Sequence, residues 1–593
     1  MNLQPSTSTL KGGEFLINTT APESIFIPEE FNEDQQMIIS MVSDFIKNKV
    51  LPQKERIENL DIELTRQLLE ESGKLGIIGI PFPEAYGGSQ MDFITSMILS
   101  ELMSEAGSFS LSFGAHTGIG MLPLLYFGSE EQKQRYLPQL VAGTYCAAYC
   151  LTEPGSGSDA LAAKSTAVLS EDGQHYVLNG QKMWITNGGF ADLFTVFAKI
   201  DGEHFTGFLV ERNWEGVSLG EEEKKLGIKG SSTRQVFFEN VKVPVNNVLG
   251  KIGKGHKIAF NILNIGRIKL AAGAYGGCKL ICTNALQYAK QRHQFGQSLS
   301  SFGAIQHKLA EQAIRIFANE SASYRAANDI RHKEEQLQEE GRSLGDALLG
   351  AAEEYAIECA LLKVTASECL DFTVDEGVQI YGGMGYSEEA PMAAAYRDAR
   401  INRIFEGTNE INRMLSVDML LKRGMQGHID LISKAMAAAQ AAATPSEAPT
   451  DWQGRSLHTV ERLKQAFLMV CGATVQHFMQ SLAKEQEVLM NLADIMADIY
   501  LAESTILRVA KLEGLKGEDS VGLQRDMANV FLDEAVDRVS QNCRRITSSW
   551  AEGEMRLQLD KGVAKVLRHQ RSNAKEARRR IAAALIEQNA YCF

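Results

Sequence analysis

The order of secondary-structure patterns along the chain is the feature that most restricts its fold. Helical periodicity covers residues 32–140, short apolar or alternating runs with turns between them cover 145–245, and long helical segments return from Gly255 to Lys422. A doubly wound sheet would require strand and helix to alternate throughout the chain. The pattern therefore predicts a mainly α protein with a central β domain.

Local signals support this division. Asn32 and Gln35 fit a capping box at the start of the first helix. Asn179-Gly180 indicates a hairpin turn, because both residues tolerate positive φ. The ranges 204–212 and 234–243 have the alternating pattern of strands.

The domain boundaries follow changes in composition. The stretch 435–450 is rich in alanine, proline and serine, which is typical of a linker, and 452–593 contains helical patterns and no proline. Proline is scarce in the whole chain, with 13 in 593 residues, as expected of long helices. We expect six parts along the chain: a loose arm (1–31), a helical N-domain (32–143), a β domain (144–250), a helical bundle (251–430), a linker (431–451) and an extra helical domain (452–593).

Composition excludes several classes of protein. The net charge of −14 argues against a nucleic-acid binder, which needs a basic surface. The nine cysteines are scattered and odd in number, which indicates reduced thiols, and neither CxxC nor HExxH occurs, so no metal site is predicted. The first 30 residues lack the signature of a signal or transit peptide, and no long apolar run occurs. We therefore expect a cytoplasmic protein without a transmembrane segment.

Five short motifs follow one another along the chain. They are TEPGSGSD at 152–159, QKMWITN at 181–187, QRHQFG at 291–296, QIYGGMGY at 379–386 and RIFEGTNEINR at 403–413. In the first, glycines allow a tight backbone that can present N–H groups to a phosphate or a polar ring edge, and Trp184 in the second offers a flat face for stacking. Taken singly, the first motif is also typical of a turn at a strand end, the second of a core tryptophan, and the last of a surface glutamate.

Together, in this order, the motifs resemble those of the acyl-CoA dehydrogenase family of flavoproteins. The segment SFGAHTGIG at 112–120 and the C-terminal extension make the chain most similar to the very-long-chain type. The resemblance implies a helical N-domain, a β-barrel-like middle domain, a four-helix-bundle C-domain and an extra C-terminal helical domain. It also implies FAD as the cofactor, a fatty acyl-CoA as the substrate and an electron-transfer flavoprotein as the electron acceptor. The family reaction removes a proton from the α-carbon and a hydride from the β-carbon.

The resemblance assigns Glu406 as the catalytic base. Phe405 is apolar and would raise the pKa of a neighbouring carboxylate, and Gly407 lets the backbone approach a substrate. Some relatives place the base just before an arginine, but Gly266 occupies that position before Arg267 and cannot act. The thioester oxygen is expected to accept a hydrogen bond from the Glu406 backbone N–H.

Further site residues are implied by their positions in the motifs. Thr186 is expected to bond the hydride-accepting nitrogen. Five residues are expected to hold the adenosine diphosphate half, partly across a subunit interface, which implies at least a homodimer: Arg292, Phe295, Gln306, Gln379 and Gly383. Gln294 and Asn264 depart from the family's usual threonine and aspartate. The expected substrate-binding residues are Ser158, Asn264, Arg267, Phe405 and Gly407. The expected cofactor-binding residues are Tyr149, Cys150, Leu151, Thr152, Gly157, Ser158, Trp184, Ile185, Thr186, Arg292, Phe295, Gln306, Gln379, Gly383, Thr408, Asn409 and Glu410.

Three questions remain open at the level of sequence. Small residues at Gly114 and Ala115 indicate room for a long acyl chain, while His116 fits either the acyl cavity or the core. The range 556–581 holds nine basic residues among apolar ones, which is typical either of a helix that contacts anionic membranes or of a solvated face or a subunit contact with the acidic body. A flavin-binding scaffold and an acyl-CoA oxidase are the alternative functions.

Overall fold

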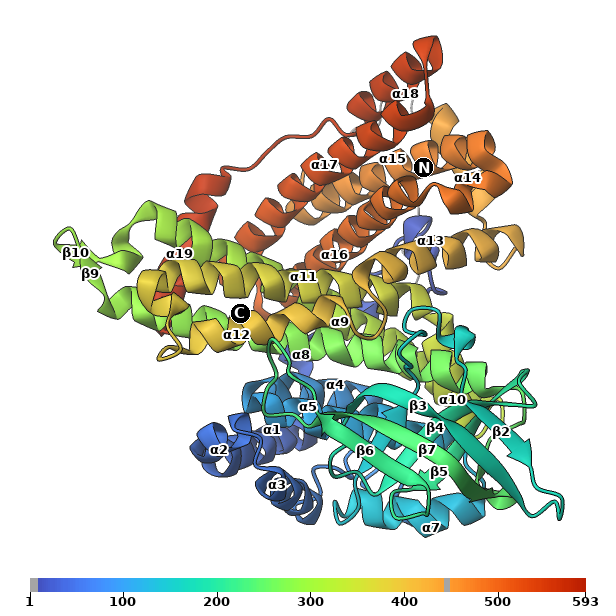
Figure 1. The fold of residues 1–593 in the computed structure, drawn as a ribbon. Helices are drawn as coiled ribbons and strands as arrows, with labels where there is room; N and C mark the ends of the chain where they lie inside the picture. The colour runs from blue at the N-terminus through green and yellow to red at the C-terminus, as the bar shows by residue number, and fades with distance from the viewer. Residues whose placement is uncertain (1–8, 442–447) are drawn as a thin grey trace. The chain divides into compact units, whose positions relative to one another are not determined.

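The computed structural model describes residues 9–441 and 448–593 (Figure 1). Its contacts divide the chain into two compact units. One unit, here called the sheet unit, contains residues 32–273 and 333–353. The other, the helical unit, contains the described part of the first 31 residues together with 274–332 and 354–593. Each unit is described by itself.

The sheet unit begins with short helices whose starts are capped by polar side chains. Asn32 and Gln35 form the predicted capping box of the first helix, which confirms that prediction. Asp61, Asp92 and Ser129 cap three later helices. The helices are α1 (Glu33–Phe45), α2 (Lys54–Glu58), α3 (Ile62–Lys74), α4 (Phe93–Met103), α5 (Ser108–Ala115), α6 (Leu122–Phe127) and α7 (Glu130–Val141).

An eight-stranded sheet follows, in the order β6-β7-β3-β2-β4-β5-β8, with β1 also paired to β4. Two pairs in this sheet are parallel, β1 with β4 and β2 with β4; the other pairs are antiparallel. Valine and phenylalanine side chains fill its core, among them Phe194, Val196 and Val210. The strands are β1 (Ala147–Cys150), β2 (Thr166–Leu169), β3 (His175–Thr186), β4 (Leu193–Ile200), β5 (His204–Glu211), β6 (Val217–Glu222), β7 (Thr233–Pro244) and β8 (Val248–Leu249).

The two predicted strands are confirmed as β5 and β7, but the predicted hairpin at Asn179-Gly180 is wrong. Both residues lie inside the long strand β3, which pairs with β7 across a shift in register between Leu178 and Gly180. A Cβ atom at Gly180 would lie 2.1 Å from Ser165 Oγ, so glycine is required there by the close approach of another segment.

Long helices build the helical unit. Helix α8 (Gly255–Gln291) belongs to the sheet unit up to Gly273 and to the helical unit from Ala274 onward. Helix α10 (Leu344–Glu354) lies almost wholly in the sheet unit. A small hairpin of β9 (His293–Gln294) and β10 (Gln297–Ser298), which the sequence did not predict, connects α8 to the next helix. The other helices are α9 (Gly303–Glu339), α11 (Ala356–Tyr381), α12 (Pro391–Ala399) and α13 (Asn409–Met425).

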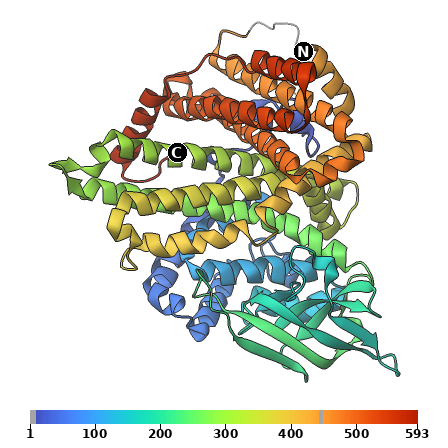
Figure 2. The same cartoon turned by 45° about the horizontal axis from the view of Figure 1, so that its top comes forward.

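The C-terminal region is helical, as predicted. Figures 1 and 2 show α15, α16 and α17 side by side, and α16 also packs against α11 and α13. The segment expected to be a linker begins with a helix, α14, and residues 442–447 of that segment lie outside the described residues. The helices are α14 (Leu431–Ala441), α15 (Trp452–Phe478), α16 (Gln486–Lys516), α17 (Gly522–Trp550), α18 (Gly553–Val566) and α19 (Ala574–Gln588).

The described part of the N-terminal arm, residues 9–31, is packed rather than loose, contrary to expectation. Phe15 is 2% exposed and its ring centroid lies 4.8 Å from that of Tyr500 in α16. Arg508 of α16 forms two ion pairs, with Glu29 of the arm at 2.9 Å and with Glu320 of α9 at 2.8 Å. The arm could not be predicted because its partners lie almost 500 residues away in the sequence.

Candidate functional site

The loop after β1 in the sheet unit is open on one side and anchored on the other. A side chain at Gly155 or Gly157 would meet no atom within 4 Å, and Ser158 is exposed. The anchor is Glu153, which is 7% exposed and bonded by Lys182 Nζ at 2.7 Å and Ser165 Oγ at 2.6 Å. The loop therefore presents backbone and hydroxyl groups to a ligand from a fixed base.

Burial alone would raise the pKa of Glu153. Hydrogen bonds from Lys182, Ser165 and the Lys164 backbone N–H outweigh it and hold the pKa of that carboxyl below its ordinary value. The Lys182 side chain is fully buried and also donates to Leu151 O at 3.2 Å. A charged pair thus ties the motif at 152–159 to the motif at 181–187.

Trp184 lies where β3 leaves its regular pairing. The register with β7 shifts between Lys182 and Ile185, and Trp184 itself has φ 61. A tryptophan in this backbone conformation is strained, which is typical of functional positions. The indole is 52% exposed, so the bulge presents a large aromatic face to solvent or to a ligand.

Several predicted cofactor contacts have buried side chains. Cys150, Leu151 and Ile185 lie in the core, with 0%, 9% and 2% exposure, so only their backbone atoms are placed to meet a cofactor. Tyr149 is also buried and its ring lies edge-on to Phe197. Thr152 and Thr186 are half-buried.

Helix α8 carries two of the predicted substrate residues of the sheet unit, Asn264 and Arg267. Arg267 Nη1 donates to Asn264 Oδ1 at 2.8 Å, and both side chains are buried. The asparagine that departs from the family pattern therefore still positions the arginine.

His116 is a core residue. It is 0% exposed, with Nε2 3.0 Å from Leu140 O and Nδ1 3.1 Å from Ala147 N. These partners require a neutral ring that donates from Nε2 and accepts at Nδ1. Of its two interpretations, the core histidine is the correct one.

His116 predicts a pH dependence of stability. Burial lowers the pKa of His116 to about 4 from an ordinary 6.5. The unfolded chain then binds a proton that the native state does not, so stability is full above pH 6.5 and falls as the pH drops toward 4, by about 3 kcal/mol in all. Urea unfolding of the wild type and of His116→Asn across this range should show a shallower pH slope in the variant. Equal slopes would contradict the assignment.

Glu406 lies in a short loop of the helical unit directly before α13. Glu406 has φ 58 and Gly407 has φ 81, so two successive residues adopt the left-handed conformation. Thr408 caps α13, with its hydroxyl accepting from Ile411 N at 3.3 Å. Phe405, Glu406 and Gly407 are all half-buried, and Oε2 of the Glu406 carboxylate is buried, so the carboxylate lies on a turn of defined shape.

A second set of predicted residues lies at the ends of α8 and α11. The β9–β10 hairpin turns at Phe295 and Gly296, with φ 53 and 79, and Phe295 is 92% exposed. The ring of Tyr288 of α8 stacks on that of Tyr381 of α11, with the centroids 4.0 Å apart. This contact brings the end of α8, which Arg292 follows, close to the end of α11, where Gln379 lies in the last turn of the helix and Gly383 just beyond it. Gln306 is half-buried and donates to Ser300 O at 3.1 Å.

The last two residues expected to bind the cofactor differ in exposure. Glu410 is exposed, whereas Asn409 is 2% exposed and its amide is bonded to protein groups. Within residues 9–441 and 448–593, no cluster of side chains is suited to a metal ion, and no helix is long and apolar enough to cross a bilayer.

Comparison with known proteins identifies the family. Four domain models match the chain: acyl-CoA dehydrogenase N-terminal domain at 32–144, middle domain at 148–241, and two C-terminal domain models at 253–421 and 462–563. A probable acyl-CoA dehydrogenase of Bacillus subtilis (strain 168) is 43% identical over 583 residues, 98% of each chain. The chain belongs to the acyl-CoA dehydrogenase family.

Two further acyl-CoA dehydrogenases extend the comparison. The mitochondrial very long-chain specific enzyme of Bos taurus is 33% identical, over 92% of this chain and 85% of that one. A crystal structure of acyl-CoA dehydrogenase complexed with FAD from Bacillus anthracis superimposes with a TM-score of 0.97 at 44% identity, over 98% and 100% of the two chains. The predicted family and fold, including the extra helical domain, are confirmed. The chain is an oxidoreductase of this family.

The motifs of this acyl-CoA dehydrogenase did not reveal two residues that hold its Glu406 loop. Lys363 Nζ donates to Gly407 O at 2.7 Å, and Asn412 Nδ2 donates to the same oxygen at 2.8 Å. Both side chains are 0% exposed. A signal was available for Lys363, because it is the one charge in the apolar run 359–367.

Proposed function

We propose that the protein oxidises long-chain fatty acyl-CoA to trans-2-enoyl-CoA in fatty-acid β-oxidation, with Glu406 as the base that removes the α-proton. The single observation that carries this proposal is the loop at Glu406. A carboxylate there follows an apolar residue and precedes a glycine, in a conformation that costs energy and is braced by buried side chains. Such a carboxylate is suited to abstract a proton next to a thioester carbonyl.

The cofactor we propose is FAD, and the sheet unit offers a fitting surface for it. The exposed face of Trp184 and the open backbone at Gly155 and Gly157 suit a flat ring and its polar edge. FAD supplies, when bound, the acceptor for the β-hydride. The residues of this chain orient the substrate, and the resemblance to the family assigns Arg267 a part in binding it.

The chain-length preference is supported by two glycines on one side of α5 and its continuation. A Cβ atom at Gly114 or Gly118, four residues apart, would meet no atom within 4 Å. Small residues at this position leave room for a long acyl tail. We therefore place the far end of the acyl chain along this surface.

Filling this space should shorten the preferred substrate. Gly114→Leu is expected to lower kcat/KM for palmitoyl-CoA about 10-fold or more relative to octanoyl-CoA, since each displaced methylene is worth about 1–3 kcal/mol. Gly514→Leu, at another helical glycine with open space around it, is the matched control and should leave the ratio unchanged. An unchanged ratio in Gly114→Leu would remove the acyl chain from this surface.

We also propose a homodimer that shares the cofactor. Phe295, at the tip of a hairpin, is almost fully exposed, as is expected of a residue that a partner covers. Along α11, Gln379 lies 16 residues beyond Lys363, or about 24 Å at the rise of an α-helix. Because Lys363 contacts the Glu406 loop, the residues expected to hold the adenosine diphosphate half are remote from the base of the same chain. A monomeric mass in solution that persists with FAD bound would refute the shared site.

The basic segment 556–581 is not one helix, because it is broken between α18 and α19. Ion pairs occupy most of its α19 part: Arg578 with Glu311 at 2.6 Å and Arg580 with Asp526 at 2.7 Å. These ion pairs within the chain favour neither a free membrane-binding face nor a merely solvated one for α19. We restrict the proposed membrane contact to α18.

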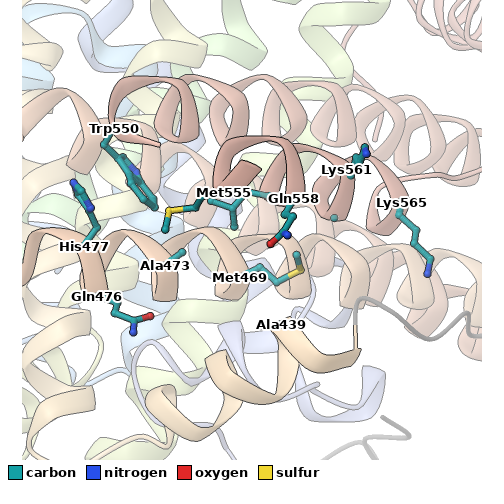
Figure 3. A pocket seen from close by; sticks show the side chains of 12 residues that line it. Ala439, Met469, Ala473, Gln476, His477, Trp550, Met555, Gln558, Lys561 and Lys565 are labelled. Atoms are coloured by element: carbon teal, nitrogen blue, oxygen red, sulfur yellow. The ribbon is translucent and has the colours of Figure 1, made fainter. Parts of the chain in front are cut away.

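Helix α18 exposes apolar side chains beside a pocket. Met555 and Leu557 are 55% and 52% exposed, and a pocket of about 650 Å³ is lined by Met469, Trp550 and Lys565 among others (Figure 3). An apolar surface next to lysines suits the surface of an anionic bilayer. Flotation of the intact protein with anionic vesicles, and its loss in Leu557→Glu, is the expected result; no flotation of the wild type would refute the contact.

We propose that the electrons pass to an electron-transfer flavoprotein in the cytoplasm. None of the nine cysteines, all of which are described, forms a disulfide, which supports a reducing compartment.

The test of the function is anaerobic addition of acyl-CoA thioesters to the purified protein. We expect a yellow protein whose flavin band bleaches, faster with palmitoyl-CoA than with octanoyl-CoA, and whose product is an enoyl-CoA. Rapid recolouring by oxygen in place of the electron-transfer flavoprotein would indicate an oxidase. A yellow protein that neither thioester bleaches would indicate the flavin-binding scaffold, and a colourless protein that cannot take up FAD would refute the enzyme.

A further inference from the structure

The carbonyl groups of the Glu406 loop are held by a buried cation and a buried amide. Lys363 of α11 donates to Gly407 O, and Asn412 of α13 donates to Gly407 O and, at 3.0 Å, to Thr408 O. Left-handed backbone at a glutamate is strained and persists only where its surroundings fix it. These bonds fix the direction in which the loop presents its carboxylate.

The same contacts continue away from the loop. Lys363 Nζ also donates to Asn409 Oδ1 at 2.8 Å, and Asn409 Nδ2 donates to Glu368 Oε1 at 3.1 Å. Asn409 is the first residue of α13, and Glu368 lies on α11. The loop, the helix after it and the helix behind it therefore form one connected network.

Arg413 extends the network into the extra helical domain. Its guanidinium bonds both oxygens of Glu368, at 2.8 and 2.9 Å, and its Nε lies 2.7 Å from Asp494 Oδ1 in α16. The Arg413 side chain is 14% exposed and Asp494 is 38% exposed. The bidentate geometry fixes the arginine in orientation as well as in charge.

We infer that Lys363 and Arg413 are positioning residues for Glu406, and that Asp494 makes the extra helical domain part of the support of the catalytic loop. The inference rests on the proposed role of Glu406 as the base. It gives the C-terminal extension a role in the chemistry besides any contact it makes with a membrane. A chain that ends after α13 would lack Asp494 and would need another partner for Arg413.

Two aspartates on α16 allow a matched test. Asp494 pairs with Arg413, whereas Asp498, one turn further, pairs with Arg538 of α17 at 2.8 Å. Asp498 is the more buried of the two side chains, at 13% exposure. If ion pairs of α16 act only through stability, Asp498→Ala should therefore have at least as large an effect as Asp494→Ala.

The experiment measures the single-turnover rate of flavin bleaching by palmitoyl-CoA, its pH profile and the thermal midpoint in the FAD-loaded enzyme. Asp494→Ala is expected to slow bleaching about 5- to 20-fold and to shift the pH profile, because small misplacement of a catalytic group is costly. Asp494→Asn, which keeps an acceptor for Arg413, should recover at least half of the wild-type rate. Asp498→Ala should stay within twofold of the wild type.

Lys363→Met, which removes the cation next to Gly407, is expected to slow bleaching more than Asp494→Ala. The inference is overturned if Asp494→Ala bleaches at the wild-type rate, or if both aspartate variants lose rate in proportion to their thermal midpoints. Glu406→Gln, measured alongside, tests the role of Glu406 as the base separately from the role of the residues that support its loop. A fully active Glu406→Gln would refute the base itself, and with it the need for its support.

Discussion

Replacing Glu406 by glutamine is expected to lower the rate of flavin bleaching by acyl-CoA about 10³-fold or more. Glutamine has almost the same shape as glutamate and keeps the loop, but its amide cannot take the α-proton. General bases contribute about 10²–10⁴ to rates, and here the proton is removed from carbon. The measurement is anaerobic stopped-flow mixing of the variant with palmitoyl-CoA.

The control for Glu406→Gln is a carboxylate on the helix that follows. Asp418→Asn removes an exposed acid of α13 that pairs with Lys422, and the rate should not change. The FAD content of Glu406→Gln should also match that of the wild type, since the flavin-binding residues are untouched. Equal rates in Glu406→Gln and wild type would mean that another group removes the proton.

Lys182→Met is expected to have the largest effect on stability. It leaves the Glu153 carboxylate buried beneath the loop at 152–159 without its cation, and breaking one partner of a buried pair costs about 3–5 kcal/mol. Because Glu153 anchors the loop, the variant should also lose FAD more readily on dilution. Thermal unfolding and the flavin absorbance of the purified variant measure the two effects.

The double variant Glu153→Gln with Lys182→Met provides the control for this prediction. It removes both charges, so it should recover much of the stability that the single variant loses. A Lys182→Met protein as stable as the wild type would show that the pair contributes nothing to the anchor of the loop.

Much of the site could be predicted from sequence because it is encoded in contiguous segments. The loop at 152–159, the exposed Trp184 and the turn at Glu406 each need only a few neighbouring residues to take their form. Glycines mark where the backbone must turn or be approached, and a capping box marks where a helix starts. These signals are local and can be read without knowledge of distant segments.

The errors arose where distant segments decide the outcome. Asn179-Gly180 has the composition of a turn, but pairing with β7 keeps it within a strand. The arm at the N-terminus is short of regular structure, yet Arg508 and the ring of Tyr500 bind it to α16. The basic residues of α19 resemble a membrane-binding face until their acidic partners on α9 and α17 are known.

The support of the Glu406 loop illustrates the same limit. Lys363, Glu368, Arg413 and Asp494 come from three helices spread over 130 residues, and no spacing rule connects them. The lone lysine in an apolar helix does signal a buried partner, but only the fold shows that this partner is the carbonyl of Gly407.

The most direct test of the central claim is a single turnover with palmitoyl-CoA deuterated at the α-carbon or at the β-carbon. If Glu406 removes the α-proton while the β-hydrogen leaves as hydride, each label should slow flavin bleaching severalfold in the wild-type enzyme, and Glu406→Gln should bleach with neither. Bleaching that is insensitive to both labels, or that proceeds at the wild-type rate in Glu406→Gln, would contradict the assignment of Glu406 as the base of an acyl-CoA dehydrogenase.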